Sequence, residues 1–251
     1  MKNILVNGKN LEKIYHMNQG EKVHSIDGID ITIREGQFTV IMGDSGSGKS
    51  TLLYLLSGLE PATRGEIQIN SVSINNMNES ELAIFRRKNI GFVFQNINLI
   101  PNMTLLENLM LPGLLINRNQ KEVMQNSKNL LEKFDLSSQA NKLPAQMSGG
   151  QQQRGAIARA LVNSPKIIFA DEPTGNLNSS NSKMVIETLM KLHSEGQTII
   201  MVTHDYKIAA YGDEVLYIRD GKIISKRDNC KSDSMEERES LLISWLDEKG
   251  W

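Results

Sequence analysis

Residues 43–50 read Gly-Asp-Ser-Gly-Ser-Gly-Lys-Ser and match the phosphate-binding pattern G-x-x-x-x-G-K-[S/T]. An apolar, β-branched run over 38–42 precedes this loop, and leucines at helix-compatible spacing follow it over 52–56. Glycines let backbone N–H groups wrap around an anion, and a helix that starts at the loop adds its positive N-terminal end. The order of strand, glycine loop and helix therefore predicts an α/β fold that binds a nucleotide.

The same pattern predicts a role for each polar residue of the loop. Lys49 is expected to reach the β- and γ-phosphates, and Ser50 to place its hydroxyl on Mg²⁺, a hard cation that prefers oxygen ligands. The alternative is a glycine-rich turn that joins a strand to a helix and binds nothing. The residues expected to contact the nucleotide here are Gly43, Asp44, Ser45, Gly46, Ser47, Gly48, Lys49, Ser50 and Thr51.

Composition limits what else the chain is expected to do. Its 251 residues, 39% of them hydrophobic, suffice for one large domain or two small ones with a buried core. Lys and Arg number 28 against 29 Asp and Glu, a net charge of −1, so no overall positive charge favours DNA or RNA. Recognition of phosphate is therefore expected to be local.

Cysteine content and apolar runs indicate the compartment. The single cysteine, Cys230, excludes an internal disulfide and a multi-cysteine zinc site, which favours a reducing compartment. Residues 1–7 lack the apolar region of a secretory signal, and the apolar run over 109–116 falls far short of the ~20 residues that cross a bilayer. The chain is expected to be cytoplasmic and to span no membrane.

Hydrophobic patterning divides the chain into strand-rich and helix-rich parts. Short strands are predicted over 4–72, and helices dominate 79–161, including an amphipathic helix over 120–134. Continuous apolar runs over 166–171 and 197–204 predict buried parallel strands. Further helices are expected over 182–193, as the crossover between these strands, and over 151–162; an amphipathic piece over 241–246 lies in an acidic tail.

Two apolar strands are expected to end in catalytic side chains. Asp171 ends one and is followed by Glu172, so one carboxylate can bind Mg²⁺ through water while the next orients or deprotonates the attacking water. The alternative is an acidic helix N-terminus before Pro173. His204 ends the other strand and is expected to hydrogen-bond the γ-phosphate and the water, unless it is purely structural.

A second motif, Ser148-Gly149-Gly150-Gln151, opens a predicted helix. Ser148 and Gln151 form a capping box, and the two glycines leave backbone amides open to an anion. Together with the phosphate loop, the acidic strand end and the strand-end histidine in this order, the motif resembles the ATP-binding cassette of ABC transporters. The resemblance covers about residues 4–226.

The resemblance implies a P-loop NTPase core with an antiparallel β subdomain and an inserted α-helical subdomain. The ATP-binding domain would cover residues 1–228, with the helical subdomain inserted at about 79–161. The change in composition after it predicts that residues 229–251 form a C-terminal acidic amphipathic tail. Two copies would form a head-to-tail dimer around two ATP molecules, each covered by Ser148, Gly149, Gly150 and Gln151 of the other copy.

The resemblance also implies roles for single residues. Tyr15 would stack on adenine, unless it is a half-buried strand tyrosine, and Gln95 would contact Mg²⁺ and link the nucleotide to the helical insert. The implied catalytic residues are Lys49, Glu172 and His204. The implied metal-binding residues are Ser50, Gln95 and Asp171.

Several segments resemble one subgroup, which serves lipoprotein release, macrolide export and antimicrobial-peptide resistance. These segments are 169–177, 98–101, Glu107 with Asn108, and Pro112. The subgroup implies a peripheral location on the inner face of the cell membrane and a permease with few transmembrane helices and a large extracytoplasmic domain. The permease's coupling helix would dock in a groove after Gln95. A soluble cassette ATPase acting on DNA or ribosomes is the alternative, and a nucleotide-binding module without catalysis is disfavoured by Glu172 and His204.

Two features remain open at this point. Asn178 stands where most members of the resembled family have Asp. The asparagine amide keeps the hydrogen-bonding capacity of that carboxylate but lacks its charge. The loss of charge puts the strength of coupling between the two ATP sites in doubt. The tail carries both tryptophans, Trp245 and Trp251. It is expected to be a helix that packs on its own domain, and the alternative is a helix that docks a partner.

Overall fold

The computed structural model describes residues 3–16, 22–229 and 233–251 and divides the chain into two compact units. Unit 1 comprises residues 1–82 and 196–251, and unit 2 comprises residues 83–195. Cys230 lies outside the described residues. No helix in the described ranges is both long and apolar enough to cross a membrane. The domain boundaries expected from the sequence remain predictions.

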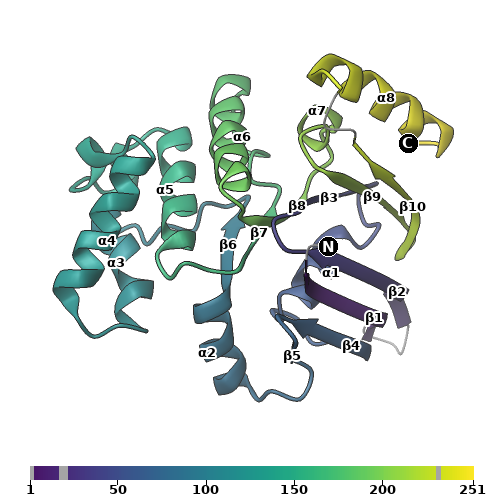
Figure 1. Ribbon diagram of the computed structural model, residues 1–251, viewed down its shortest axis with the longest axis horizontal. Helices are drawn as coiled ribbons and strands as arrows, with labels where there is room; N and C mark the ends of the chain where they lie inside the picture. The colour runs from purple at the N-terminus through teal and green to yellow at the C-terminus, as the bar shows by residue number, and fades with distance from the viewer. Residues whose placement is uncertain (1–2, 17–21, 230–232) are drawn as a thin grey trace. The chain divides into compact units, whose positions relative to one another are not determined.

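Unit 1 contains the predicted antiparallel sheet, with strand order β2-β1-β4-β5 (Figure 1). Alternating apolar residues produce it: Ile29, Ile31 and Ile33 are buried while the residues between them are exposed. The strands are β1 (Ile4–His16), β2 (Lys22–Arg34), β4 (Arg64–Ile69) and β5 (Val72–Ser73).

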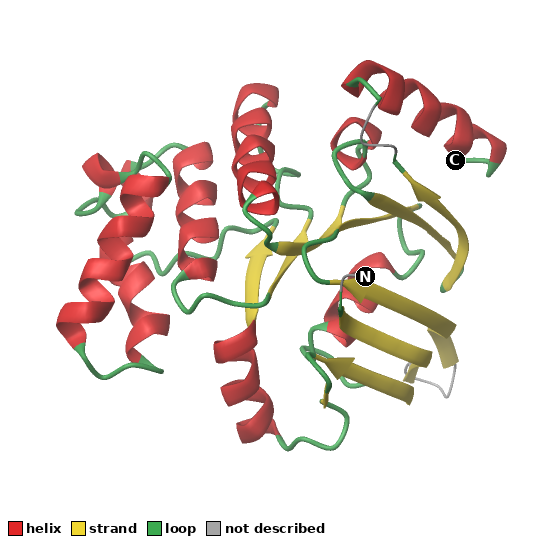
Figure 2. Cartoon of the chain, viewed as in Figure 1, coloured by secondary structure: helices red, strands yellow, loops and turns green. Residues whose placement is uncertain are grey.

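A second group of strands in unit 1 carries the phosphate loop. β3 (Phe38–Gly43) pairs in parallel with β8 (Thr198–Val202) and β9 (Glu214–Arg219), and β10 (Lys222–Asp228) pairs antiparallel with β9. Every residue of β3 and β8 is buried, as their continuous apolar runs predict. Helix α1 (Lys49–Leu56) follows the loop with four buried leucines, so the predicted strand, loop and helix are confirmed (Figure 2).

The C-terminal tail forms helix α8 (Met235–Glu248), which packs on unit 1 together with the short α7 (Tyr206–Ala209). A capping box between Ser234 and Glu237 starts α8, and Leu242 and Leu246 are fully buried. The Trp245 ring meets the ring of buried Tyr217 edge-on at 6.3 Å. These contacts agree with a helix that packs on its own domain.

Unit 2 combines helices with a pair of parallel strands, β6 (Ile90–Phe94) and β7 (Ile167–Asp171). The predicted amphipathic helix is α4, with Val123, Leu131 and the flanking Phe134 buried. The predicted crossover helix is α6. The predicted helix after the capping box is α5. The helices are α2 (Glu79–Asn89), whose first four residues belong to unit 1, α3 (Leu105–Leu114), α4 (Gln120–Lys133), α5 (Gly149–Leu161) and α6 (Ser179–Ser194), with 3₁₀ turns at Ser137–Gln139 and Pro144–Gln146.

Replacing Leu246 by Ala is expected to loosen α8, because a fully buried leucine leaves a cavity that costs about 2–5 kcal/mol. Leu241, on the same helix but 46% exposed, is the matched control, and Leu241→Ala should cost well under ~1 kcal/mol. Both tryptophans lie in the tail, so tryptophan fluorescence during urea unfolding reports on α8 directly. Equal midpoints for the two variants would contradict the packing of α8.

Candidate functional site

The phosphate loop is held by backbone contacts that exclude side chains at two of its glycines. A Cβ atom at Gly43 would lie 2.0 Å from the carbonyl oxygen of Ile218, and one at Gly48 would lie 2.4 Å from that of Ser25. Gly48 also has a φ of +100°, in the left-handed region that favours glycine. The loop therefore packs directly on β9 and β2, which only glycine allows.

Within the loop, the structure shows a cradle that fits an anion. The Lys49 side chain is buried and its Nζ donates to the Asp44 carbonyl at 2.7 Å, so its charge lies across the loop. The buried Ser47 Oγ has no hydrogen-bond partner among the described residues, and no atom lies within 4 Å of a Cβ placed on Gly46. Phosphate oxygens supply the acceptors that such a hydroxyl and an ammonium need.

His204 lies at the same strand edge as the phosphate loop. β3 and β8 are parallel neighbours, with Ile41 opposite Val202, so their carboxyl ends lie side by side. The Thr203 amide extends this pairing by donating to the Ile41 carbonyl at 3.2 Å. His204 itself is exposed, and Asp205 caps α7 directly after it. This position fits the predicted contact with a phosphate.

Tyr15 lies near the end of β1, opposite Val23, and is 37% exposed. Lys13 Nζ lies 5.0 Å from the centre of the tyrosine ring and pairs with Glu60 at 2.6 Å. A partly exposed ring suits stacking on a base, which remains a prediction. Lys13 was not predicted from the sequence, because an alternating strand pattern does not show which lysine side chain packs against a tyrosine ring.

In unit 2, Gln95 and the acidic pair follow neighbouring strand ends. β6 and β7 are parallel, with Phe94 opposite Asp171, so Gln95 and Glu172 leave the pair at the same edge. Glu172 has a φ of +44°, unusual for a residue with a side chain and typical of functional sites. These residues offer Mg²⁺ the oxygen ligands it prefers.

Two residues of the loop after Glu172 hold Gln95. A Cβ on Gly175 would lie 2.7 Å from Gln95 Nε2, so the glutamine side chain rests on this glycine. Asn176 Oδ1 accepts from Gln95 Nε2 at 3.4 Å, and Asn176 Nδ2 donates to the Gln95 carbonyl at 3.3 Å. The sequence analysis missed Asn176, whose role depends on a contact 81 positions away.

The capping box at the start of α5 is confirmed. Ser148 N donates to Gln151 Oε1 at 3.0 Å, and Gln151 N donates to Ser148 Oγ at 3.3 Å. The structure adds a second reason for the glycines, because a Cβ on Gly150 would lie 2.5 Å from Asn181 Oδ1 of α6. The motif therefore also lets the first turns of α5 and α6 approach each other.

Asn178 is the N-cap of α6, a role that the sequence analysis did not assign to it. Its Oδ1 accepts from the Asn181 amide at 3.0 Å and from Ser180 Oγ at 3.0 Å. Because an aspartate carboxylate accepts the same bonds, the amide is not required for the cap.

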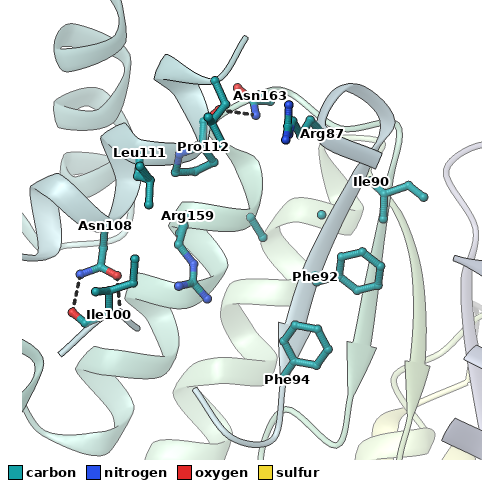
Figure 3. A pocket seen from close by; sticks show the side chains of 13 residues that line it. Arg87, Ile90, Phe92, Phe94, Ile100, Asn108, Leu111, Pro112, Arg159 and Asn163 are labelled. Atoms are coloured by element: carbon teal, nitrogen blue, oxygen red, sulfur yellow. Dashed lines mark hydrogen bonds between the residues drawn. The ribbon is translucent and has the colours of Figure 1, made fainter. Parts of the chain in front are cut away.

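A cavity of about 290 Å³ lies beside β6 in unit 2 (Figure 3). Phe92 and Phe94 line it from β6, Leu111 and Leu115 from the end of α3, and Arg159 from α5. Arg159 Nη1 donates to the Asn98 carbonyl at 2.6 Å, and burial lowers the pKa of its guanidinium. The cavity is therefore largely apolar, and two arginines, Arg87 and Arg159, are part of its lining.

Asn108 shapes the rim of this cavity. It is fully buried, its Oδ1 accepts from the Ile100 amide at 2.7 Å, and its Nδ2 donates to the Ile100 carbonyl (Figure 3). The same Nδ2 also donates to the carbonyls of Met103 and Thr104. The turn before α3 is thereby locked. On α5, Gln153 Nε2 donates to the Phe94 carbonyl at 3.1 Å, which ties the helix of the capping box to the strand end before Gln95.

Apart from Tyr15 on β1, the predicted site residues thus fall into three groups in the structure. The phosphate loop and His204 share a strand edge in unit 1, and Gln95, Asp171 and Glu172 share one in unit 2. The capping-box motif lies separately, at the start of α5. Among the described residues, no group of three or more His, Cys, Asp and Glu side chains gathers to hold a metal.

Comparison with known proteins gives consistent matches. Residues 26–175 match the family described as ABC transporter. An uncharacterized ABC transporter ATP-binding protein of Methanocaldococcus jannaschii is 46% identical over 88% of this chain and 98% of its own length. A macrolide export ATP-binding/permease protein of Neisseria meningitidis is 43% identical over 88% of this chain, which spans 34% of that protein. A dimeric ATP-binding cassette solved in a post-hydrolysis state with ADP and Pi superposes with a TM-score of 0.83 at 40% identity, covering 90% of this chain and 99% of that one.

Asn178→Asp is expected to leave the free energy of unfolding and the affinity for ATP unchanged while altering turnover or its cooperativity, because the cap survives and a charge is added. Asn178→Ala should lower the free energy of unfolding by about 1 kcal/mol through loss of the cap. Urea unfolding and the ATP dependence of hydrolysis measure these effects. Identical turnover and Hill coefficients in Asn178→Asp and the parent would refute a role in coupling.

Proposed function

Since the chain belongs to the ABC transporter family of Mg²⁺-dependent ATP hydrolases, we propose that it is the motor subunit of a membrane permease of the lipoprotein-release, macrolide-export or antimicrobial-peptide-resistance type. The observation that carries this proposal is the cavity beside β6. Three residues of the subgroup-like segments, Ile100, Asn108 and Pro112, line it. Three of the segments that resemble this subgroup therefore contribute to a surface suited to a partner.

We assign the chemistry of hydrolysis as follows. Lys49 and the amides of the phosphate loop bind the phosphates, and Tyr15 stacks on the base. Ser50, Gln95 and Asp171 would hold Mg²⁺, which would neutralise negative charge on the phosphates. Glu172 orients or deprotonates the attacking water, and His204 steadies the γ-phosphate. This arrangement accelerates phosphoryl transfer by positioning and electrostatic stabilisation.

We further propose that two copies form a head-to-tail dimer in which Ser148–Gln151 of one copy cover the ATP of the other. The capping box holds the first turn of α5 in place, and Gly149 adds no side chain that would block its amide. One of the similar solved cassettes is a dimer. Closing and opening of this dimer would drive the permease from the inner face of the membrane.

The permease would dock in the groove beside β6. This groove is the cavity lined by Phe92, Phe94, Leu111, Leu115 and Arg159. Its apolar wall fits the apolar face of a short helix. Arg159 and Gln153 connect the same surface to the loop that follows Gln95 and to the strand end before it. A helix pressed into the groove would therefore act on Gln95 and on α5 together.

Replacing Glu172 by Gln is expected to slow ATP hydrolysis by at least a hundredfold and to trap an ATP-bound dimer, because the amide cannot accept the proton of the water. Hydrolysis assays and size-exclusion chromatography with ATP measure the two effects. Asn176→Ala, which leaves the carboxylate intact, is a control for loop damage and should reduce the rate far less. Hydrolysis at the parent rate in Glu172→Gln would refute the assignment.

A cross-linked pull-down from native membranes, read by mass spectrometry, tests the partner. The parent chain should retain a permease, and Leu115→Asp should lose it because the charge lies in the groove. The matched control is Ile84→Asp, whose parent side chain is 50% exposed and lies outside the groove, and this variant should retain the permease. Ribosomal or DNA-bound partners without a permease would instead support the alternative of a soluble cassette ATPase.

A further inference from the structure

Arg219, at the end of β9, joins three parts of unit 1. Its Nη2 donates to the Tyr217 hydroxyl at 2.9 Å and to the Gly250 carbonyl at 2.8 Å, beyond the end of α8. Its Nε lies 3.7 Å from Asp44 Oδ2 in the phosphate loop. The guanidinium therefore connects the C-terminal segment to the candidate nucleotide site.

The hairpin that carries Arg219 is fixed against the phosphate loop. The Gly221 amide in its turn donates to the Ser47 carbonyl at 3.0 Å, and Gly43 packs on the Ile218 carbonyl. Because these are backbone contacts, the turn cannot shift without disturbing the loop. The backbone that carries Arg219 is thus fixed in position next to the loop that contains Asp44.

The C-terminal segment also contacts the aromatic ring that lies beside the Arg219 guanidinium. Trp245 of α8 packs edge-on against the Tyr217 ring, and the Arg219 guanidinium lies 5.4 Å from the centre of that ring. Trp251 meets Tyr206, two residues after His204, at 6.1 Å. The end of the chain therefore contacts the surroundings of both the phosphate loop and the strand-end histidine.

Charge explains what this arrangement can do. A carboxylate in a loop that binds phosphates repels them, and a nearby guanidinium offsets this repulsion. The side chains of Arg219 and Asp44 are 35% and 56% exposed, so solvent screens the pair and a modest effect is expected. Arg219 does not need to touch the nucleotide to influence its affinity.

We propose that Arg219 is a positioning residue of the phosphate loop, held in place by the C-terminal segment, and that α8 thereby sets the affinity for nucleotide. The proposal rests on the assignment of the phosphate loop as the nucleotide site. It gives the tail a regulatory role, because any event that loosens α8 would release Arg219 from Gly250 and weaken its hold on Asp44.

The first test measures binding of fluorescently labelled ADP with Mg²⁺ to the full-length chain at low salt. Arg219→Gln should raise the Kd about two- to fivefold in the parent chain, but by much less in the Asp44→Asn background, where no carboxylate remains for the guanidinium to offset. The double variant should therefore bind labelled ADP about as tightly as Asp44→Asn alone. The control is Lys222→Gln, which removes the same charge from the same hairpin but from an exposed pair with Asp27, and it should change the Kd by less than half as much.

The second test asks whether the tail acts through Arg219. Trp245→Ala should raise the Kd for labelled ADP in the parent chain but add no further increase in the Arg219→Gln background. Leu241→Ala, at an exposed position of α8, should leave the Kd unchanged. Urea unfolding followed by circular dichroism identifies variants that are not folded. Arg219→Lys keeps the positive charge and should therefore bind labelled ADP more tightly than Arg219→Gln.

Two results would overturn the proposal. One is an equal rise in Kd for Arg219→Gln and Lys222→Gln, since the effect would then come from net charge alone. The other is an equal effect of Trp245→Ala in both backgrounds. If the parent chain does not bind labelled ADP, or if Lys49→Ala binds it as well as the parent does, the phosphate-loop assignment itself fails, and this outcome is distinct from both.

Discussion

The close approach of backbone to backbone at Gly43 and Gly48 is the constraint on which the candidate site depends. At these two positions the phosphate loop lies against carbonyl groups of β9 and β2, with no space for a side chain. The loop is therefore shaped by its neighbours as well as by its own sequence. Lys49 is buried within this frame, and its charge stays directed across the loop.

In unit 2, helix α5 has the corresponding organising role. Its first turn carries the capping box, Gln153 reaches the strand end before Gln95, and Arg159 holds the backbone that follows it. One helix thus connects the predicted dimer surface, the predicted Mg²⁺-binding glutamine and the groove beside β6. Such shared contacts offer a physical route by which a docked partner can influence hydrolysis.

Much of the fold follows from local patterns. The apolar runs of β3, β7 and β8 are short, continuous and bounded, so buried parallel strands were predictable, and the capping box at Ser148 marks the start of α5. The residues that the analysis missed act through contacts distant in sequence. Asn176 holds a loop 81 positions away, and Arg219 bridges to Gly250 and Asp44.

By itself, the sequence determined the elements and the chemistry of the motifs, because helix caps, strand periodicity and a phosphate loop are encoded within a few consecutive residues. Only the tertiary structure decided what surrounds those motifs. It showed that Asn178 caps α6, that Gly150 makes room for Asn181, and that Arg219 links the segment after α8 to the phosphate loop. These relations depend on which distant segments pack together, and no local pattern records that.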